Sequence, residues 1–180
     1  VTRKYLFELS DGKSIETVSI PMKVGKRTIC VSTQVGCSMG CKFCLNSFTK
    51  QMRNLTTAEI VGQIMSIEER DITNVVYMGM GEPLLNLDNV IQSIDILTDE
   101  LGLNLSYRRI TVSTCGLVPQ MKEFTERSRA KLAVSLHGTT DEQRNSIMPV
   151  NRKYPLDSLL TFCRQYPADN HHRITFEYVL

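Results

Sequence analysis

The sequence predicts an α/β fold, namely a partial TIM-type (βα) barrel that follows an N-terminal β-hairpin. Strand-like and helix-like segments alternate along its 180 residues, which is typical of parallel strands joined by right-handed crossovers. The 42% apolar content supports one substantial core, and no linker rich in Pro and Gly divides the chain. An open doubly wound sheet is the alternative arrangement.

Residues 1–29 are expected to form the hairpin and to lead into the first barrel strand. KYLFELS and SIETVSI flank DGK, and Asp-Gly favours a tight turn. The β-branched run RTICVSTQVG predicts the first barrel strand. NLTTAEIVGQIMSIEER predicts the first helix, because Thr56 and Glu59 form a capping box and Ile60 and Ile64 begin an apolar stripe.

The barrel core is expected to span residues 30–180 and to stop before the barrel closes. Four more strands are predicted, at ITNVVYMGMG, RITVSTCG, KLAVSLHG and ITFEYVL. Helices are predicted between them, at LDNVIQSIDILTDEL, VPQMKEFTER, TTDEQRNSIM and PLDSLLTFCRQ. Five barrel strands are fewer than the eight of a closed TIM barrel, so we expect an incomplete one.

Three of these helices carry further local signals. One apolar face of LDNVIQSIDILTDEL is expected to contain Val90, Ile94, Leu97 and Leu101. Prolines near the first turn open VPQMKEFTER and PLDSLLTFCRQ, where a missing N–H costs nothing.

A second capping box is predicted in the short segment TTDEQRNSIM. Its members are Thr139 and Glu142, three residues apart, as at the first helix. We therefore expect this helix to begin at Thr139.

Charge and composition narrow the class of protein. Residues 1–55 hold nine Lys or Arg against three Asp or Glu, a net charge of +6, and the remainder carries −4. A basic region suits a polyanion such as RNA, although a solvated surface is the simpler interpretation. The charged start lacks the apolar region of a signal peptide, and no apolar run approaches the ~20 residues of a membrane span. We expect a cytoplasmic protein, in which metal or redox roles are more common for cysteines than structural disulfides.

Polar or glycine-rich segments follow four consecutive predicted strands. They are CSMGCKFC, MGMGEP, STCG and SLHG. The carboxyl ends of parallel barrel strands open on one face of the barrel. The sequence therefore predicts a single cavity lined by all four segments.

CSMGCKFC places three cysteines, Cys37, Cys41 and Cys44, within eight positions. A structural zinc ion and a 4Fe–4S cluster normally take four protein ligands each. Three thiolates would leave one iron of a cluster open, and the amino and carboxylate groups of S-adenosylmethionine can chelate such an iron. A structural zinc-binding module remains the non-enzymatic alternative.

The CxxxCxxC spacing at the end of a first barrel strand resembles the signature of the radical SAM superfamily, and GMGEP resembles its glycine-rich SAM-binding segment. CVSTQVGCSMGCKFC, NVVYMGMGEPLLN, RRITVSTCGLVP, LAVSLHG and IMPVNRKYP together resemble the RlmN/Cfr family of radical SAM RNA methyltransferases. The RlmN-type members, which this chain resembles more, methylate carbon 2 of an adenine in 23S rRNA and in tRNA. Cfr-like methylation of carbon 8 and a radical SAM enzyme of another reaction type are the alternatives.

The resemblance implies a role for each matching residue. The ligands of a 4Fe–4S cluster are expected to be Cys37, Cys41 and Cys44, and the contacts to S-adenosyl-L-methionine are expected from Gly81, Glu82, Ser113, Ser135, Leu136 and His137. Cys30 is expected to take a proton from the adenine and then to form a disulfide with a methyl-carrying cysteine. Glu16 corresponds to a proton acceptor of the family.

The resemblance also implies what lies outside the chain. No residue matches the methyl-carrying cysteine, which we expect beyond Leu180, and the small N-terminal accessory domain of the family has no counterpart. We therefore expect a fragment that cannot complete methyl transfer alone. The implied partners are rRNA, tRNA and an electron donor such as flavodoxin or ferredoxin, with no membrane and a monomeric state.

Overall fold

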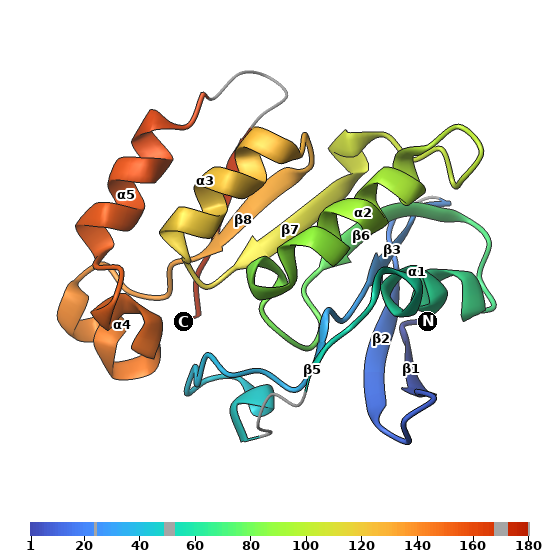
Figure 1. The fold of residues 1–180 in the computed structure, drawn as a ribbon, viewed down its shortest axis with the longest axis horizontal. Coiled ribbons are helices and arrows are strands. Elements are labelled where there is room, and N and C mark those ends of the chain that lie inside the picture. Colours follow the sequence, from blue (N-terminus) through green and yellow to red (C-terminus); the bar gives the residue numbers. More distant parts are fainter. Residues whose placement is uncertain (24, 49–52, 168–172, 180) are drawn as a thin grey trace.

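The computed structural model describes residues 1–23, 25–48, 53–167 and 173–179. Their main feature is a seven-stranded sheet in the order β1-β2-β3-β6-β7-β8-β9, shown in Figure 1. Its strands are β1 (Arg3–Glu8), β2 (Ser14–Pro21), β3 (Arg27–Cys30), β6 (Ile72–Tyr77), β7 (Ile110–Thr114), β8 (Lys131–Ser135) and β9 (Ile174–Glu177). Strands β1, β2 and β3 pair antiparallel, and every later pair is parallel. The prediction of an α/β fold with an N-terminal hairpin is confirmed.

The strand order distinguishes a barrel segment from a doubly wound sheet. From β3 onward, each strand lies beside the next one in the chain, without the reversal that defines a doubly wound sheet. Right-handed crossovers that always advance in one direction place their helices on the same face. These helices are α1 (Thr57–Ser66), α2 (Leu87–Thr98), α3 (Val118–Arg127) and α5 (Leu156–Gln165), which follow one another across the sheet in Figure 1.

The core lies between the sheet and these helices. Val75, Tyr77, Val112 and Val134 are all completely buried on the helix side of their strands. Successive side chains of a strand point to opposite faces, so the residues that alternate with these face the inner side of the sheet. The inner side therefore receives the more polar set Cys30, Ser113, Ser135 and Glu177, which are only partly buried.

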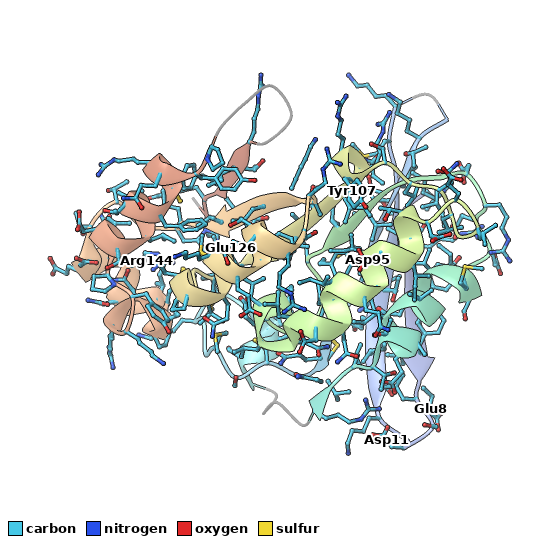
Figure 2. All side chains as sticks on the ribbon, turned by 45° about the horizontal axis from the view of Figure 1, so that its top comes forward. Glu8, Asp11, Asp95, Tyr107, Glu126 and Arg144 are labelled. Carbon is cyan, nitrogen blue, oxygen red and sulfur yellow. The ribbon has the colours of Figure 1, made fainter. Side chains whose placement is uncertain are left out.

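The hairpin tip and the remaining elements complete the fold. Glu8 and Asp11 lie at the exposed end of the hairpin in Figure 2. The shorter elements are β4 (Gln34–Val35), β5 (Arg53–Asn54), α4 (Asp141–Ile147) and the 3₁₀ helices η1 (Leu45–Phe48), η2 (Pro83–Asn86), η3 (Tyr107–Arg109) and η4 (Pro149–Arg152). Within the described ranges, no helix has the length and apolar character needed to cross a membrane.

The first barrel strand is shorter than the predicted RTICVSTQVG. β3 ends at Cys30, and the chain then leaves the main sheet. The next strand, β4, pairs with β5 in a separate two-stranded sheet. Backbone N–H groups of Thr33 and Gln34 both donate to the carbonyl of Met80, at 2.8 and 3.2 Å. The segment before the cysteines is thereby joined to the glycine-rich segment after β6.

Two local predictions about helices are wrong. Leu101 is not on the apolar face of α2, because this helix ends at Thr98 and Leu101 is 98% exposed. The N-cap of α4 is Thr140 rather than Thr139, and its hydroxyl accepts from the N–H of Gln143. The predicted box of Thr56 and Glu59 at α1 is confirmed.

Candidate functional site

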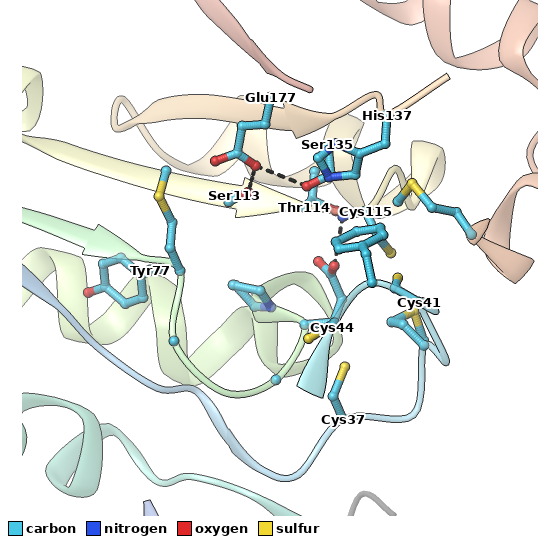
Figure 3. A pocket seen from close by; sticks show the side chains of 18 of the residues that line it. Cys37, Cys41, Cys44, Tyr77, Ser113, Thr114, Cys115, Ser135, His137 and Glu177 are labelled. Carbon is cyan, nitrogen blue, oxygen red and sulfur yellow. Dashed lines mark hydrogen bonds between the residues drawn. The ribbon is translucent and has the colours of Figure 1, made fainter. Parts of the chain in front are cut away.

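A cavity of about 370 Å³ opens at the carboxyl ends of β6, β7, β8 and β9. Eight of the predicted site residues line it, and Figure 3 shows most of them converging there: Cys37, Cys41, Cys44, Gly81, Glu82, Ser113, Ser135 and His137. A volume of this order is typical of small-molecule and cofactor sites. The prediction that four loops share one cavity is confirmed.

The three cysteines enter the cavity from a loop that rests on the end of α4. The N–H of Lys42 donates to the carbonyl of Ile147 at 2.8 Å, and the N–H of Cys44 donates to that of Cys41 at 3.0 Å. Cys41 is 9% exposed, and burial, then Cys37 and Cys44, raise the pKa of its thiol to about 12. All six cysteines of the chain are free thiols.

Three thiols of one loop line the cavity, which is the number that a 4Fe–4S cluster with one open iron would take. Among the residues that the structure describes, no three His, Cys, Asp or Glu side chains lie close enough together to hold a single ion. A structural zinc ion requires such a compact tetrahedral set. Three thiols around one cavity suit a 4Fe–4S cluster, in which each thiolate binds a different iron.

The segment after β6 packs closely against Gln34. Gly81 has φ +99°, and a Cβ atom there would lie 2.6 Å from the Cβ of Gln34. Only glycine fits this conformation at such a close approach. The Gln34 Oε1 atom accepts the N–H of Glu82 at 2.9 Å, so the loop is fixed directly behind the cavity wall.

Glu82 is buried, and its carboxylate is occupied by backbone donors. It accepts the N–H of Cys115 at 2.8 Å and the N–H of Leu84 at 3.2 Å. Burial raises the pKa of Glu82, while these hydrogen bonds oppose the rise. Glu82 therefore ties the loop after β6 to the loop after β7.

Glu177 is a site residue that sequence reasoning missed. Its Oε2 atom accepts hydrogen bonds from the hydroxyls of Ser113 at 2.6 Å and Ser135 at 2.9 Å, drawn as dashed lines in Figure 3. The carboxylate thus orients both serines, which come from neighbouring strands. A charged residue at the end of the otherwise apolar ITFEYVL was the available signal, because the other strands also carry their site residues at this end.

His137 is held in one orientation by its neighbours. Its backbone has φ 53°, and its Nδ1 atom accepts the N–H of Val179 at 3.1 Å. The ring also meets the edge of Phe43, from the cysteine loop, with centroids 4.4 Å apart. Burial lowers the pKa of His137, so the neutral ring can donate its other N–H toward the cavity.

Three predicted site residues do not line the cavity, namely Leu136, Cys30 and Glu16. Leu136 packs against the core, and its backbone bonds to Glu177 and Arg144. Cys30 lies opposite Val18 on the inner side of the sheet, where burial and then Glu177 raise its pKa to about 11.

Glu16 lies on the same inner face as Cys30. It stands two residues before Val18, the register partner of Cys30, and therefore on the same face of β2. Its carboxylate forms an ion pair with Lys4 at 2.9 Å. Glu16 is thus on the same face of the sheet as Cys30 but outside the cavity wall.

Part of the basic charge predicted to attract RNA is neutralised. Arg53 binds both carboxylate oxygens of Glu59 and also Asp11, and Arg27 pairs with Asp71 at 2.8 Å. Lys23, Lys26 and Lys42 are exposed instead. The free positive charge of the first third is therefore smaller than the sequence count.

Known proteins resemble the chain along nearly its whole length. A family model for the radical SAM superfamily matches residues 31–179. The chain is 57% identical over 181 residues to a protein named dual-specificity RNA methyltransferase RlmN from Pelobacter propionicus, covering 99% of this chain and 52% of the relative. It is 55% identical over 180 residues to the protein of the same name from Syntrophotalea carbinolica, covering 99% and 48%.

A solved structure agrees with these relatives. It is described as a radical SAM methyltransferase from Sphaerobacter thermophilus, and it matches with a TM-score of 0.93 at 45% identity. The match covers 99% of this chain and 54% of that one. The chain thus spans about half the length of the relatives that it matches.

Proposed function

The chain belongs to the radical SAM superfamily, and we propose that the whole protein methylates carbon 2 of a specific adenine in 23S rRNA and in tRNA. The observation that carries this proposal is the convergence of three cysteines with the segments after β6, β7 and β8 on one cavity. The RlmN names of the relatives favour this reaction over the Cfr-like methylation of carbon 8. The substrates are then rRNA and tRNA, met in the cytoplasm by a monomeric enzyme.

We assign the cluster to Cys37, Cys41 and Cys44, which line the cavity on one side. When bound, the cluster and S-adenosylmethionine supply a 5′-deoxyadenosyl radical, for which a flavodoxin or ferredoxin provides the electron. The chain itself contributes the pocket and its rigidity. The structure joins none of these three thiols to another cysteine.

We assign the binding of S-adenosylmethionine to the cavity wall opposite the three cysteines. Ser113 and Ser135 hold their hydroxyls in place through Glu177, and His137 has a free ring N–H. The glycine-rich segment exposes its backbone beside them. Glu82 contributes by fixing this segment, since both of its oxygens already accept backbone N–H groups.

We assign proton removal from the adenine to the inner side of the sheet, where Cys30 and Glu16 lie. A thiol with a pKa of about 11 is protonated at neutral pH. Cys30 can therefore act as a base only after it loses this proton, and Glu16 is the acceptor that the family resemblance suggests. The partner cysteine, which carries the methyl group, is proposed to lie beyond Leu180.

The cluster assignment is tested by anaerobic reconstitution of the full-length protein with iron and sulfide. Single alanine variants of Cys37, Cys41 and Cys44 should lose the iron–sulfur absorption band. Cys163→Ala is the matched control, because this thiol packs on α5 against the core and should not affect the band. A colourless wild-type protein that retains zinc would refute the assignment.

The reaction is tested with the reconstituted protein, an rRNA fragment and S-adenosylmethionine. Mass spectrometry of the digested RNA should find 2-methyladenosine, and 8-methyladenosine would instead support the Cfr-like alternative. Cys30→Ala should accumulate a covalent protein–RNA adduct. An unmethylated RNA with an intact cluster would favour a radical SAM enzyme of another reaction type.

A further inference from the structure

Arg144, on α4, is the largest fully buried side chain among the described residues. Figure 2 shows it within the group of helices at one end of the molecule. Its guanidinium donates to the carbonyls of Cys115 at 2.6 Å, Ser135 at 3.2 Å and Leu136 at 3.1 Å, and to Asn151 Oδ1 at 2.7 Å. The side chain therefore joins the ends of β7 and β8 below the cavity.

These partners accept from four of the five N–H groups of Arg144, and none of them carries a charge. All four are neutral oxygens, and no carboxylate of the described residues forms an ion pair with the guanidinium. Asp141, an acid on the same helix, instead accepts from Asn151 at 2.7 Å and from the N–H of Leu156 at 2.8 Å. A buried charge without a counter-charge is costly, so such groups are usually paired.

The same segment supports the loop of three cysteines. Ile147, at the end of α4, accepts the N–H of Lys42, and a Cβ atom on Gly40 would lie 3.7 Å from Pro149. Met148 is fully buried and lines the cavity. Cys115, whose carbonyl accepts from Arg144, lines the same cavity as Cys41.

We propose that Arg144 is a positioning residue of the cluster site, whose buried positive charge is compensated by the negatively charged thiolate–cluster unit and raises its reduction potential. Three thiolates and a cluster carry net negative charge, which increases by one on reduction. A fixed cation nearby therefore favours the reduced state, and net charge is a known determinant of cluster potentials. The inference rests on the proposed cluster site.

The test is the reduction potential of the reconstituted full-length protein, titrated by electron paramagnetic resonance at equal cluster content. Arg144→Gln and Arg144→Met both remove the charge, and the first of them retains hydrogen-bond donors. In both variants the ratio of reduced to oxidised cluster at the wild-type midpoint should fall by about tenfold or more, which corresponds to ~59 mV for one electron. Arg144→Lys, which retains the charge, should remain closest to the wild type.

Arg127→Gln is the control for loss of an arginine. This residue lies in the last turn of α3, at the opposite end of the helix from the cavity, and pairs with Asp88 and Glu123 on the surface. Its potential should equal that of the wild type. The inference is overturned if Arg144→Gln and Arg144→Met both keep the wild-type potential, or if Arg144→Lys shifts it as far as Arg144→Gln. Failure of the wild-type protein to bind any cluster is a different result, which refutes the proposed function itself.

Discussion

The carboxylate of Glu82 accepts the backbone N–H of Cys115 at a distance of 2.8 Å, and this bond joins the segments that follow β6 and β7. The second oxygen of Glu82 accepts the N–H of Leu84, so the side chain also caps η2. A buried acid that accepts from two backbone donors holds the two loops of the cavity wall together. The site is consequently built by side chains that hold loops as well as by those that face the ligand.

Glu82→Gln should weaken this wall. A glutamine has one acceptor oxygen and one NH₂ group, so one of the two backbone N–H groups would face another donor. Hydrogen bonds to charged groups contribute roughly 1.5–3 kcal/mol, and we expect the free energy of unfolding to fall by about 2 kcal/mol in urea titrations. S-adenosylmethionine should also bind more weakly in calorimetry. Glu126→Gln, on the exposed side of α3, should change neither quantity; equal effects of the two variants would contradict the proposed structural role.

His137 should make stability depend on pH. Burial lowers its pKa in the folded protein below the ordinary 6.5. Both states hold the neutral ring above pH 6.5, and below it the unfolded chain takes up the proton first. The contribution of His137 is therefore present above pH 6.5 and is lost as the pH falls through the folded pKa.

The measurement compares urea unfolding of the wild type and His137→Asn between pH 5 and 8. Asparagine tolerates the positive φ of this position better than most residues. The other histidines remain in both proteins, so their titration cancels. The stability difference should shrink toward acid pH, and a difference that is constant over the range would show that burial does not disfavour the imidazolium ion.

Local patterns predicted much of the fold and the contents of the cavity. Thr56 and Glu59 lie three residues apart, so their box depends only on helical geometry. The cavity residues were predictable because parallel strands bring their carboxyl ends together. The apolar pattern failed at Leu101. The backbone carbonyl of Asp99 accepts the N–H groups of Gly102 and Asn104, and the chain turns out of the helix there.

The residues that support the site were not predictable from local patterns. Arg144 occurs in a short polar helix, where arginine is usually solvated. Its burial depends on carbonyls that lie up to 29 positions away along the chain. Thr139 and Thr140 are both competent caps, and only the tertiary position of α4 selects the second.

Cys30 should react slowly with alkylating reagents in the folded protein. Burial, with a further contribution from Glu177, raises its pKa from 9.0 to about 11. At pH 8 the thiolate fraction is therefore lower by about 100-fold, and iodoacetamide labelling of its peptide, followed by mass spectrometry, should slow at least in proportion. The urea-unfolded protein is the control. Equal labelling rates in the two states would show that the folded protein does not protect this thiol.

Gly81→Ala should destabilise the protein because of both the backbone conformation and the contact with Gln34. A residue with a side chain at φ +99° is strained by about 1–3 kcal/mol, and the new Cβ would lie 2.6 Å from Gln34. We expect the free energy of unfolding to fall by about 3 kcal/mol. Gly62→Ala is the matched control, because this glycine lies inside α1 with no atom within 4 Å of an added Cβ. The free energy of unfolding of this variant should rise by about 0.5–1 kcal/mol. If both variants change the free energy of unfolding in the same direction, close packing against Gln34 is not the reason why position 81 needs glycine.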